Sequence, residues 1–232
     1  MLTLADLRRR ARSRLDDEGA SSYLWSDQDL LDCINDTLID AAIRANLTVQ
    51  CGLAIPFVQN ADLTWKAQYA LPSNTLSVRG VYLLSQPEVN LIETSYRRIR
   101  QLAFGRPTQV GSPYSYALDQ TQAGTGDDLG NLVRTITFIA TPDKADTAIV
   151  DVVRLPAELE YDDDTPEMDG MWQPDLVYGI TGLAYLKKDA DTFDPKRSLR
   201  DLQIFEDRFG PRLPAAVLRE RQTDVPLQMI VG

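Results

Sequence analysis

The hydrophobic pattern changes twice along the chain, and these changes restrict the fold more than any other feature of the sequence. Apolar residues recur at helical spacing up to residue 46, and they do so again after residue 174. Between these stretches lie short β-branched and aromatic runs of strand length, separated by Pro, Gly and Asp/Asn turns. The most economical packing joins the terminal helices in one bundle. We therefore predict an α+β fold, with a helical bundle from residues 1–50 and 170–210, an inserted antiparallel β-rich subdomain with an acidic connector over 51–169, and an extended C-terminal tail over 211–232.

Helix-start signals support the two helical segments. A hydroxyl residue followed three positions later by a carboxylate forms a capping box, and Thr3 with Asp6 and Ser26 with Asp29 both fit. The second box predicts a helix over residues 27–46. Pro174 fits the first turn of a third helix that carries Lys187 and Lys188 at its C-terminal end.

A fourth helix is expected to begin at Asp194-Pro195 and to stop at Gly210-Pro211. Its expected apolar face consists of Leu199, Leu202, Phe205 and Phe209.

Strands are predicted where the middle block is apolar or alternating. The expected strand segments are residues 53–58, 69–72 leading into 75–84, 114–118, 134–139 and 147–155. We also expect a short helix within residues 91–104 and a mobile hairpin tip over 120–131.

The composition excludes several classes of function. The sequence has no histidine, so a Ser-His-Asp triad, a Cys-His pair and a His-bearing zinc site are excluded. The net charge of −10 argues against a general grip on nucleic acid, which needs a basic face. Cys33 and Cys51 are expected to be reduced thiols, and no segment has the length and hydropathy of a membrane span. We expect a soluble intracellular product.

Eight carboxylates between residues 158 and 175 form the strongest local feature, and residues 155–186 contain no Lys or Arg. A calcium loop that starts at Asp162 fails, because Pro166 and Glu167 occupy positions 5 and 6. We interpret the run as a solvated acidic connector. A metal site and a carboxylate-pair glycosidase remain weaker alternatives.

Other motifs also favour a protein without catalysis. The sequence has no G-x-S-x-G, Walker or G-x-G-x-x-G motif, and Gly124-Thr-Gly126 suits a turn better than a phosphate loop. Trp25, Trp65 and Trp172 are expected to anchor the core rather than to stack on a ligand. We predict no cofactor and no metal.

Arginines crowd the first helix, and Asp6, Asp16 and Asp17 lie close to them. A solvated or intersubunit salt-bridge face is therefore preferred to a nucleic-acid contact. The tail carries apolar residues on a segment without a core of its own, which leaves disorder and docking on a partner as equal alternatives. The candidate docking residues are Leu213, Val217, Leu218, Val225, Leu227, Met229, Ile230 and Val231.

Several short segments, in order, resemble a known family. They are residues 25–36 (WSDQDLLDCIND), 69–72 (YALP) before a strand ending at 81, 105–107 (GRP), 136–142 (ITFIATP), 154–156 (RLP) and 183–192 (LAYLKKDADT). In this order they resemble the head-to-tail adaptor, or connector, proteins of tailed bacteriophages.

The resemblance implies a structural virion protein at the head–tail junction, assembled in the host cytoplasm and without enzymatic activity. It implies a twelve-fold ring that docks under the portal protein after genome packaging, extends the DNA channel and presents a surface to the tail protein. It also implies that residues 211–232 insert between portal subunits. Double-stranded DNA is expected to pass without specific binding, since an acidic wall repels phosphate.

A ring also needs heterologous interfaces between its subunits. The candidate intersubunit or lumen charges are Arg8, Arg9, Arg12, Asp162, Asp163 and Asp164. The alternative is a β-rich tail-associated or carbohydrate-binding module on a helical mount, and a third possibility is an acid-based hydrolase or metal enzyme.

Overall fold

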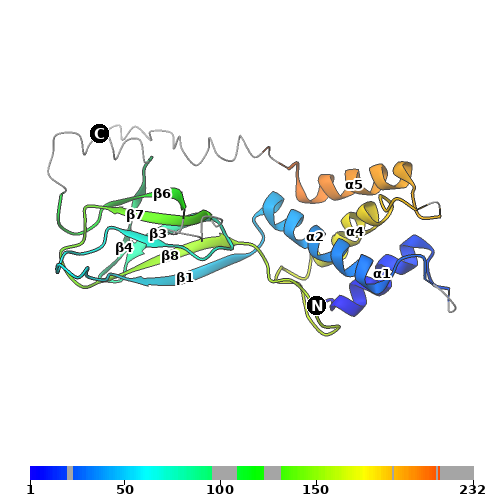
Figure 1. The fold of residues 1–232 in the computed structure, drawn as a ribbon, viewed down its shortest axis with the longest axis horizontal. Helices are drawn as coiled ribbons and strands as arrows, with labels where there is room; N and C mark the ends of the chain where they lie inside the picture. Colours follow the sequence, from blue (N-terminus) through cyan, green and yellow to red (C-terminus); the bar gives the residue numbers. More distant parts are fainter. Residues whose placement is uncertain (20–22, 96–108, 123–131, 190, 213, 215–232) are drawn as a thin grey trace. The chain divides into compact units, whose positions relative to one another are not determined.

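The computed structural model describes residues 1–19, 23–95, 109–122, 132–189, 191–212 and 214 (Figure 1). The chain is an α+β protein, as predicted. It divides into two compact units. The helical unit contains Met1–Thr48 and Arg154–Arg212, and the β unit contains Val49–Val153.

Four α-helices and one short 3₁₀ helix form the described part of the helical unit. They are α1 (Leu4–Leu15), α2 (Asp27–Ala45), η1 (Gln173–Asp175), α4 (Leu176–Ala184) and α5 (Pro195–Phe209). None of these helices is long and apolar enough to cross a membrane.

The predicted helix starts are confirmed. Both capping boxes form at the starts of α1 and α2, and Asp194 accepts hydrogen bonds from the backbone of Lys196 and Arg197 at the start of α5. The expected position of Lys187 and Lys188 is wrong, because α4 ends at Ala184 and both lysines lie beyond it.

The helices of this unit share one apolar core. Its fully buried members include Leu4 and Leu7 of α1, Ile34 of α2, Ile180 of α4 and Phe205 of α5. Helix α4 approaches its neighbours closely through glycines. A Cβ at Gly179 would lie 2.5 Å from Thr37 Cγ2, and a Cβ at Gly182 would lie 2.7 Å from Leu202 Cγ.

The predicted apolar face of α5 is partly wrong. Phe205 and Phe209 are buried, but the Leu199 residue is 69% exposed. The buried face instead carries Ser198 and Asp201, because each has a partner on α4. A hydrophobic pattern alone places polar residues on the solvent side, even when they are buried and hydrogen-bonded. The predicted buried face of α5 is therefore rotated by about one residue from the observed one.

Eight strands form two sheets in the β unit. The first sheet has the order β1 (Val49–Pro56), β8 (Thr147–Arg154), β3 (Thr75–Leu83) and β4 (Gln86–Asn90). The second has the order β2 (Gln68–Ala70), β7 (Leu132–Ile139), β6 (Ser115–Gln122) and β5 (Ile92–Glu93).

Side chains from both sheets meet in one core, so the β unit is a sandwich. Val81, Val150 and Ile136 are fully buried there. Phe57, Tyr69 and Phe138 also contact one another, with ring centroids 5.2 to 5.9 Å apart.

A bulge interrupts β1 between Gln50 and Leu53. Gly52 adopts a φ of 78° there and donates its N–H to Asp151 Oδ1 at 2.8 Å. The left-handed conformation explains why glycine occupies this position.

One prediction about this unit needs correction. The second sheet is mixed rather than antiparallel, since β5 pairs in parallel with β6. Of the range 91–104, within which a short helix is expected, Ile92–Glu93 is a strand. The remaining residues of this range from 96 onward, the hairpin tip from 123 and the tail residue 213 with 215–232 lie outside the described residues.

Strand β4 was not predicted. All of its residues are exposed, and it contains a proline, so it lacks the alternating apolar pattern that identifies a half-buried strand.

Candidate functional site

The acidic run is an ordered strap against the start of α1. We call residues 158–173 the strap. The backbone carbonyls of Asp164 and Asp162 accept the N–H groups of Leu4 and Ala5 at 2.8 and 3.1 Å. These are two of the orphan donors at a helix N-terminus, and Thr3 Oγ1 accepts a third from Asp6. The strap therefore completes the cap of the first helix.

Two amide side chains, Asn35 and Gln173, hold the strap at further points. Asn35 of α2 forms two hydrogen bonds with the backbone of Leu159, at 3.0 and 3.1 Å, and Leu159 lies in the helical core. The fully buried Gln173 accepts the N–H of Leu2 at 2.7 Å and donates to the carbonyl of Met168 at 3.2 Å. The backbone of the acidic run is thus held by the helical unit, while most of its carboxylates are exposed, as expected for a solvated connector.

The carboxylates of the run fall into two groups. Three are paired with arginines of the same chain: Asp162 with Arg8 at 2.9 Å, Glu167 with Arg154 at 2.8 Å and Asp175 with Arg208 at 3.9 Å. The pairing with Arg154 lowers the pKa of Glu167. The remaining five have no cationic partner among the described residues: Glu158, Glu160, Asp163, Asp164 and Asp169.

Asp164 and Asp169 are nevertheless held in place. Asp164 accepts the backbone N–H groups of Glu160 and Tyr161, which lower its pKa, and Asp169 accepts that of Met171. In the part of the chain that the structure describes, no group of three or more acidic or cysteine side chains is arranged to hold a metal ion.

The arginines of α1 differ in their burial and in the ion pairs that they form within the chain. Arg12 is buried and joins Asp17 at 2.7 Å and Asp27 at 2.8 Å, and its guanidinium lies 3.6 Å from the ring centroid of Tyr23. Asp17 also accepts the N–H of Leu24, so this cluster fixes the connection between α1 and α2. Of the three candidate arginines, only Arg9 is largely exposed, with 74% of its side chain accessible.

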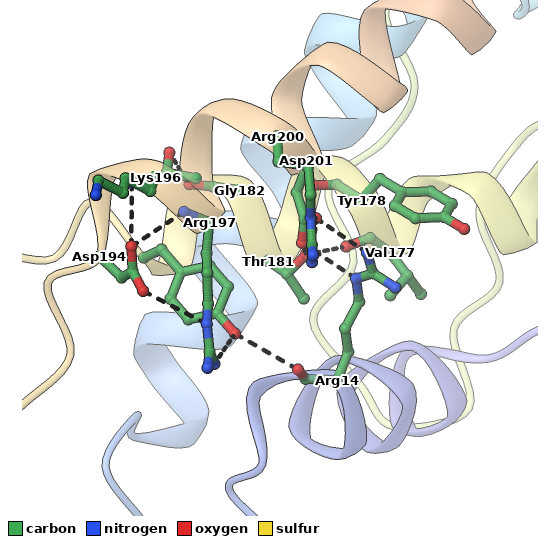
Figure 2. Close-up of polar contacts among 12 residues, drawn as sticks. Arg14, Val177, Tyr178, Thr181, Gly182, Asp194, Lys196, Arg197, Arg200 and Asp201 are labelled. Atoms are coloured by element: carbon green, nitrogen blue, oxygen red, sulfur yellow. Dashed lines mark hydrogen bonds and ion pairs between the residues drawn. The ribbon is translucent and has the colours of Figure 1, made fainter.

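A second buried ion pair was not found from the sequence. Arg14 of α1 binds both carboxylate oxygens of Asp201 on α5, at 2.9 and 3.1 Å (Figure 2). Thr181 of α4 donates its hydroxyl to the same carboxylate at 2.7 Å, and Asp201 is fully buried. Burial raises the pKa of Asp201, but hydrogen bonds from Arg14 and Thr181 outweigh it, so the pKa is lowered overall.

Figure 2 also shows the contacts at the start of α5. Arg197 approaches the hydroxyl of Tyr185 at 3.4 Å and the carboxylate of Asp194 at 3.4 Å. Ser198 Oγ donates to the carbonyl of Gly182 at 2.7 Å. These polar contacts, like the Arg14–Asp201 pair, join segments of one unit, and the Asp201 carboxylate is fully buried among them.

The tryptophans lie where the sequence predicts. Trp25 is buried, and its Nε1 donates to the carbonyl of Ala184 at 3.0 Å. Trp65 packs against the core of the sandwich and Trp172 against the helical core. Both cysteines are free, and burial raises the pKa of Cys33 to about 11.

Comparison with protein families places the chain in one family. The family model described as SU10 adaptor protein matches residues 2–229, which is nearly the whole chain. No curated protein matches the chain.

Proposed function

Since the chain belongs to the SU10 adaptor protein family, a family of phage head–tail adaptors, we propose that it is a structural component of the virion that forms a ring between portal and tail. The match over residues 2–229 is the observation that carries this proposal, because it includes both units and the tail. This role requires binding surfaces rather than catalytic residues. The Arg12–Asp17 and Arg14–Asp201 ion pairs are accordingly assigned to stabilising the fold.

The proposed ring has twelve copies, docks on the portal protein, extends the DNA channel and presents its free face to a tail protein. The two units are proposed as its two domains. The net charge of −10 supports passage of DNA without binding, since a negative surface repels phosphate and releases no counterions from it.

The structure narrows the charges available for contacts between copies. Arg8 and Arg12 are engaged within the chain, and so is Asp162. The backbone holds Asp164. Arg9 pairs with Asp6 at 3.0 Å, but 74% of its side chain stays accessible, so Arg9 and Asp163 remain as candidate intersubunit charges.

The tail is proposed as the portal-docking segment. Its apolar residues lie C-terminal to α5, where the chain leaves the helical unit after Arg212. An extended segment of this kind gains its order from the partner, so its removal is expected to abolish docking while leaving both units folded.

A truncated chain tests this proposal. Removal of residues 213–232 is expected to abolish co-sedimentation with portal rings of the same phage, whereas the full chain co-sediments. A matched control replaces Leu63, which is 76% exposed on the β unit, by Ser and is expected to bind like the wild type. Failure of the full chain to bind portal rings at any concentration would overturn the proposal.

A further inference from the structure

The outer face of α5 is an apolar and basic surface without a partner in the described chain. Leu199 and Arg200 lie three and four residues after Lys196, and Gln203 lies four and three residues after them, so all four lie on one side of the helix. All four are exposed. Arg200 reaches Asp201 at 3.2 Å, but that carboxylate already binds Arg14, and 65% of the Arg200 side chain remains accessible.

The strap offers the complementary surface. Tyr161 and Met171 on the strap are 68% and 67% exposed, so two large side chains with apolar surface are available there to a partner. Glu158, Glu160 and Asp163 are exposed on the same segment and have no ion-pair partner among the described residues. The strap thus combines apolar side chains with unpaired negative charge, whereas the outer face of α5 combines Leu199 with positive charge.

The two surfaces cannot satisfy each other within one chain. The strap is bound at Asp162 and Asp164, whose backbone carbonyls accept the first N–H groups of α1. Figure 1 shows α5 along one side of the helical unit and the loop of the strap along the other. The end of the strap does reach α5, where the ring of Trp172 lies 6.4 Å from that of Phe209, but Phe209 is the last residue of α5 and lies away from Lys196, Leu199 and Arg200. Two complementary patches on different sides of one unit can form a heterologous contact, and repetition of that contact closes a ring when the rotation permits.

We infer that the outer face of α5 binds the strap of a neighbouring copy of this chain. The inference rests on the proposed ring and identifies its subunit contact. Lys196 and Arg200 face Glu160 and Asp163 of the neighbour, and Leu199 packs among the apolar side chains of the neighbour's strap. The strap can serve as a binding surface because hydrogen bonds from Asn35 and Gln173 hold its backbone before a partner arrives.

Charge reversal on each surface tests the contact. One variant carries Lys196→Glu and Arg200→Glu, and a second carries Glu160→Lys and Asp163→Lys. Each alone places like charges across every contact and is expected to lower the amount of cross-linked oligomer at least about ten-fold, with or without portal rings. The Leu199→Asp variant is expected to have the same effect.

An equimolar mixture of the two charge-reversal variants provides the decisive readout. In a head-to-tail ring the reversed α5 of one variant meets the reversed strap of the other, so alternating copies restore every contact. The mixture is therefore expected to recover oligomers. A misfolded variant would not be rescued in this way. Lys66→Glu with Lys144→Glu, at two exposed lysines of the β unit, controls for the change in net charge.

The outcomes separate this contact from the adaptor role. Wild-type chains that bind portal rings but never cross-link to one another overturn the contact and leave the adaptor role. Rescued oligomers that do not bind portal rings keep the contact and overturn the adaptor role. Two reversal variants that assemble like the wild type, or a mixture that stays monomeric after both have failed alone, overturn the contact.

Discussion

At the scale of single residues, charge in the helical unit is used mainly for folding. Arg12 with Asp17 and Arg14 with Asp201 are ion pairs in which at least one partner is buried. A buried pair is satisfied when both partners are present and costly when one is removed, since the other charge then lies unpaired away from water.

The pair between Arg14 and Asp201 can be tested by removing its cation. Arg14→Met leaves the fully buried Asp201 carboxylate without its bidentate partner and is expected to lower the free energy of unfolding by about 3 kcal/mol. Adding Asp201→Leu is expected to recover part of this loss, because Thr181 still donates to the carbonyl of Val177. Urea unfolding measures both variants, and Arg9→Met on the exposed side of α1 is the control. Equal stability of Arg14→Met and the control would contradict a structural role.

The capping residue Asp29 predicts a specific response to acid. Hydrogen bonds from Lys187 and Ser26 lower its pKa to about 2. Its ordinary pKa in an unfolded chain is about 3.9, so the ionised form stabilises the fold fully above about pH 4 and that stabilisation is lost as the pH falls through about 2.

Urea unfolding between about pH 4 and pH 2 measures this response. Asp29→Asn is expected to lower stability at neutral pH and to flatten the acid limb of the profile, whereas Asp36→Asn, an exposed change on the same helix, leaves the profile unchanged. An acid limb of the same steepness in both variants would show that Asp29 does not contribute.

At the scale of elements, α4 packs closely on its neighbours because two of its residues, Gly179 and Gly182, have no side chain. Gly179 and Gly182 lie where a methyl group would meet Thr37 and Leu202 at 2.5 and 2.7 Å. An alanine is a better helix former by about 1 kcal/mol, but overpacking of this kind costs about 1–3 kcal/mol.

Close packing should therefore outweigh helix propensity at Gly179. Gly179→Ala is expected to destabilise the chain in thermal unfolding, and Thr37→Ser is expected to relieve part of the effect by removing the contacting methyl group. Gly170→Ala is the control, because no atom lies within 4 Å of its added Cβ. A more stable Gly179→Ala variant would mean that the helices can move apart at little cost.

The hydrogen bonds between Asn35 and the strap can be tested by proteolysis. Asn35→Ala removes both hydrogen bonds to Leu159, so limited proteolysis is expected to cut within residues 158–171 several times faster than in the wild type. Asp36→Ala, on the adjacent exposed position of α2, is expected to be cut at the wild-type rate. Unchanged cleavage of the Asn35 variant would show that other contacts suffice to hold the strap.

Local signals in the sequence were sufficient for most elements. Capping boxes predicted the starts of α1 and α2, and Asp194-Pro195 predicted that of α5, because each signal is complete within a few residues. The apolar strands β3, β7 and β8 were predicted for the same reason, whereas β4 is exposed throughout and has no such pattern.

Long-range partners account for what the sequence could not predict. Nothing local to Asp201 indicates that an arginine far earlier in the chain neutralises it, so the apolar pattern placed Leu199 on the core face of α5 and gave no sign that Asp201 is buried there. The sequence indicated a solvated acidic connector but not what holds it, since its anchors Asn35, Leu4 and Ala5 lie in the N-terminal helices.

At the scale of the whole molecule, the chain uses charge in two ways. Arg12 with Asp17 and Arg14 with Asp201 are paired within the helical unit, whereas the outer face of α5 and the strap carry accessible charge beside exposed apolar residues. The chain belongs to a family of phage head–tail adaptors, and the proposed assembly uses these accessible surfaces.

Electron microscopy of the purified chain mixed with portal rings of the same phage tests the central claim most directly. The account predicts twelve copies in a closed ring on the portal, coaxial with its channel, with α5 of each copy against the strap of the next. Portal rings that carry no added density, or a chain that stays monomeric beside them at saturating concentration, would contradict it.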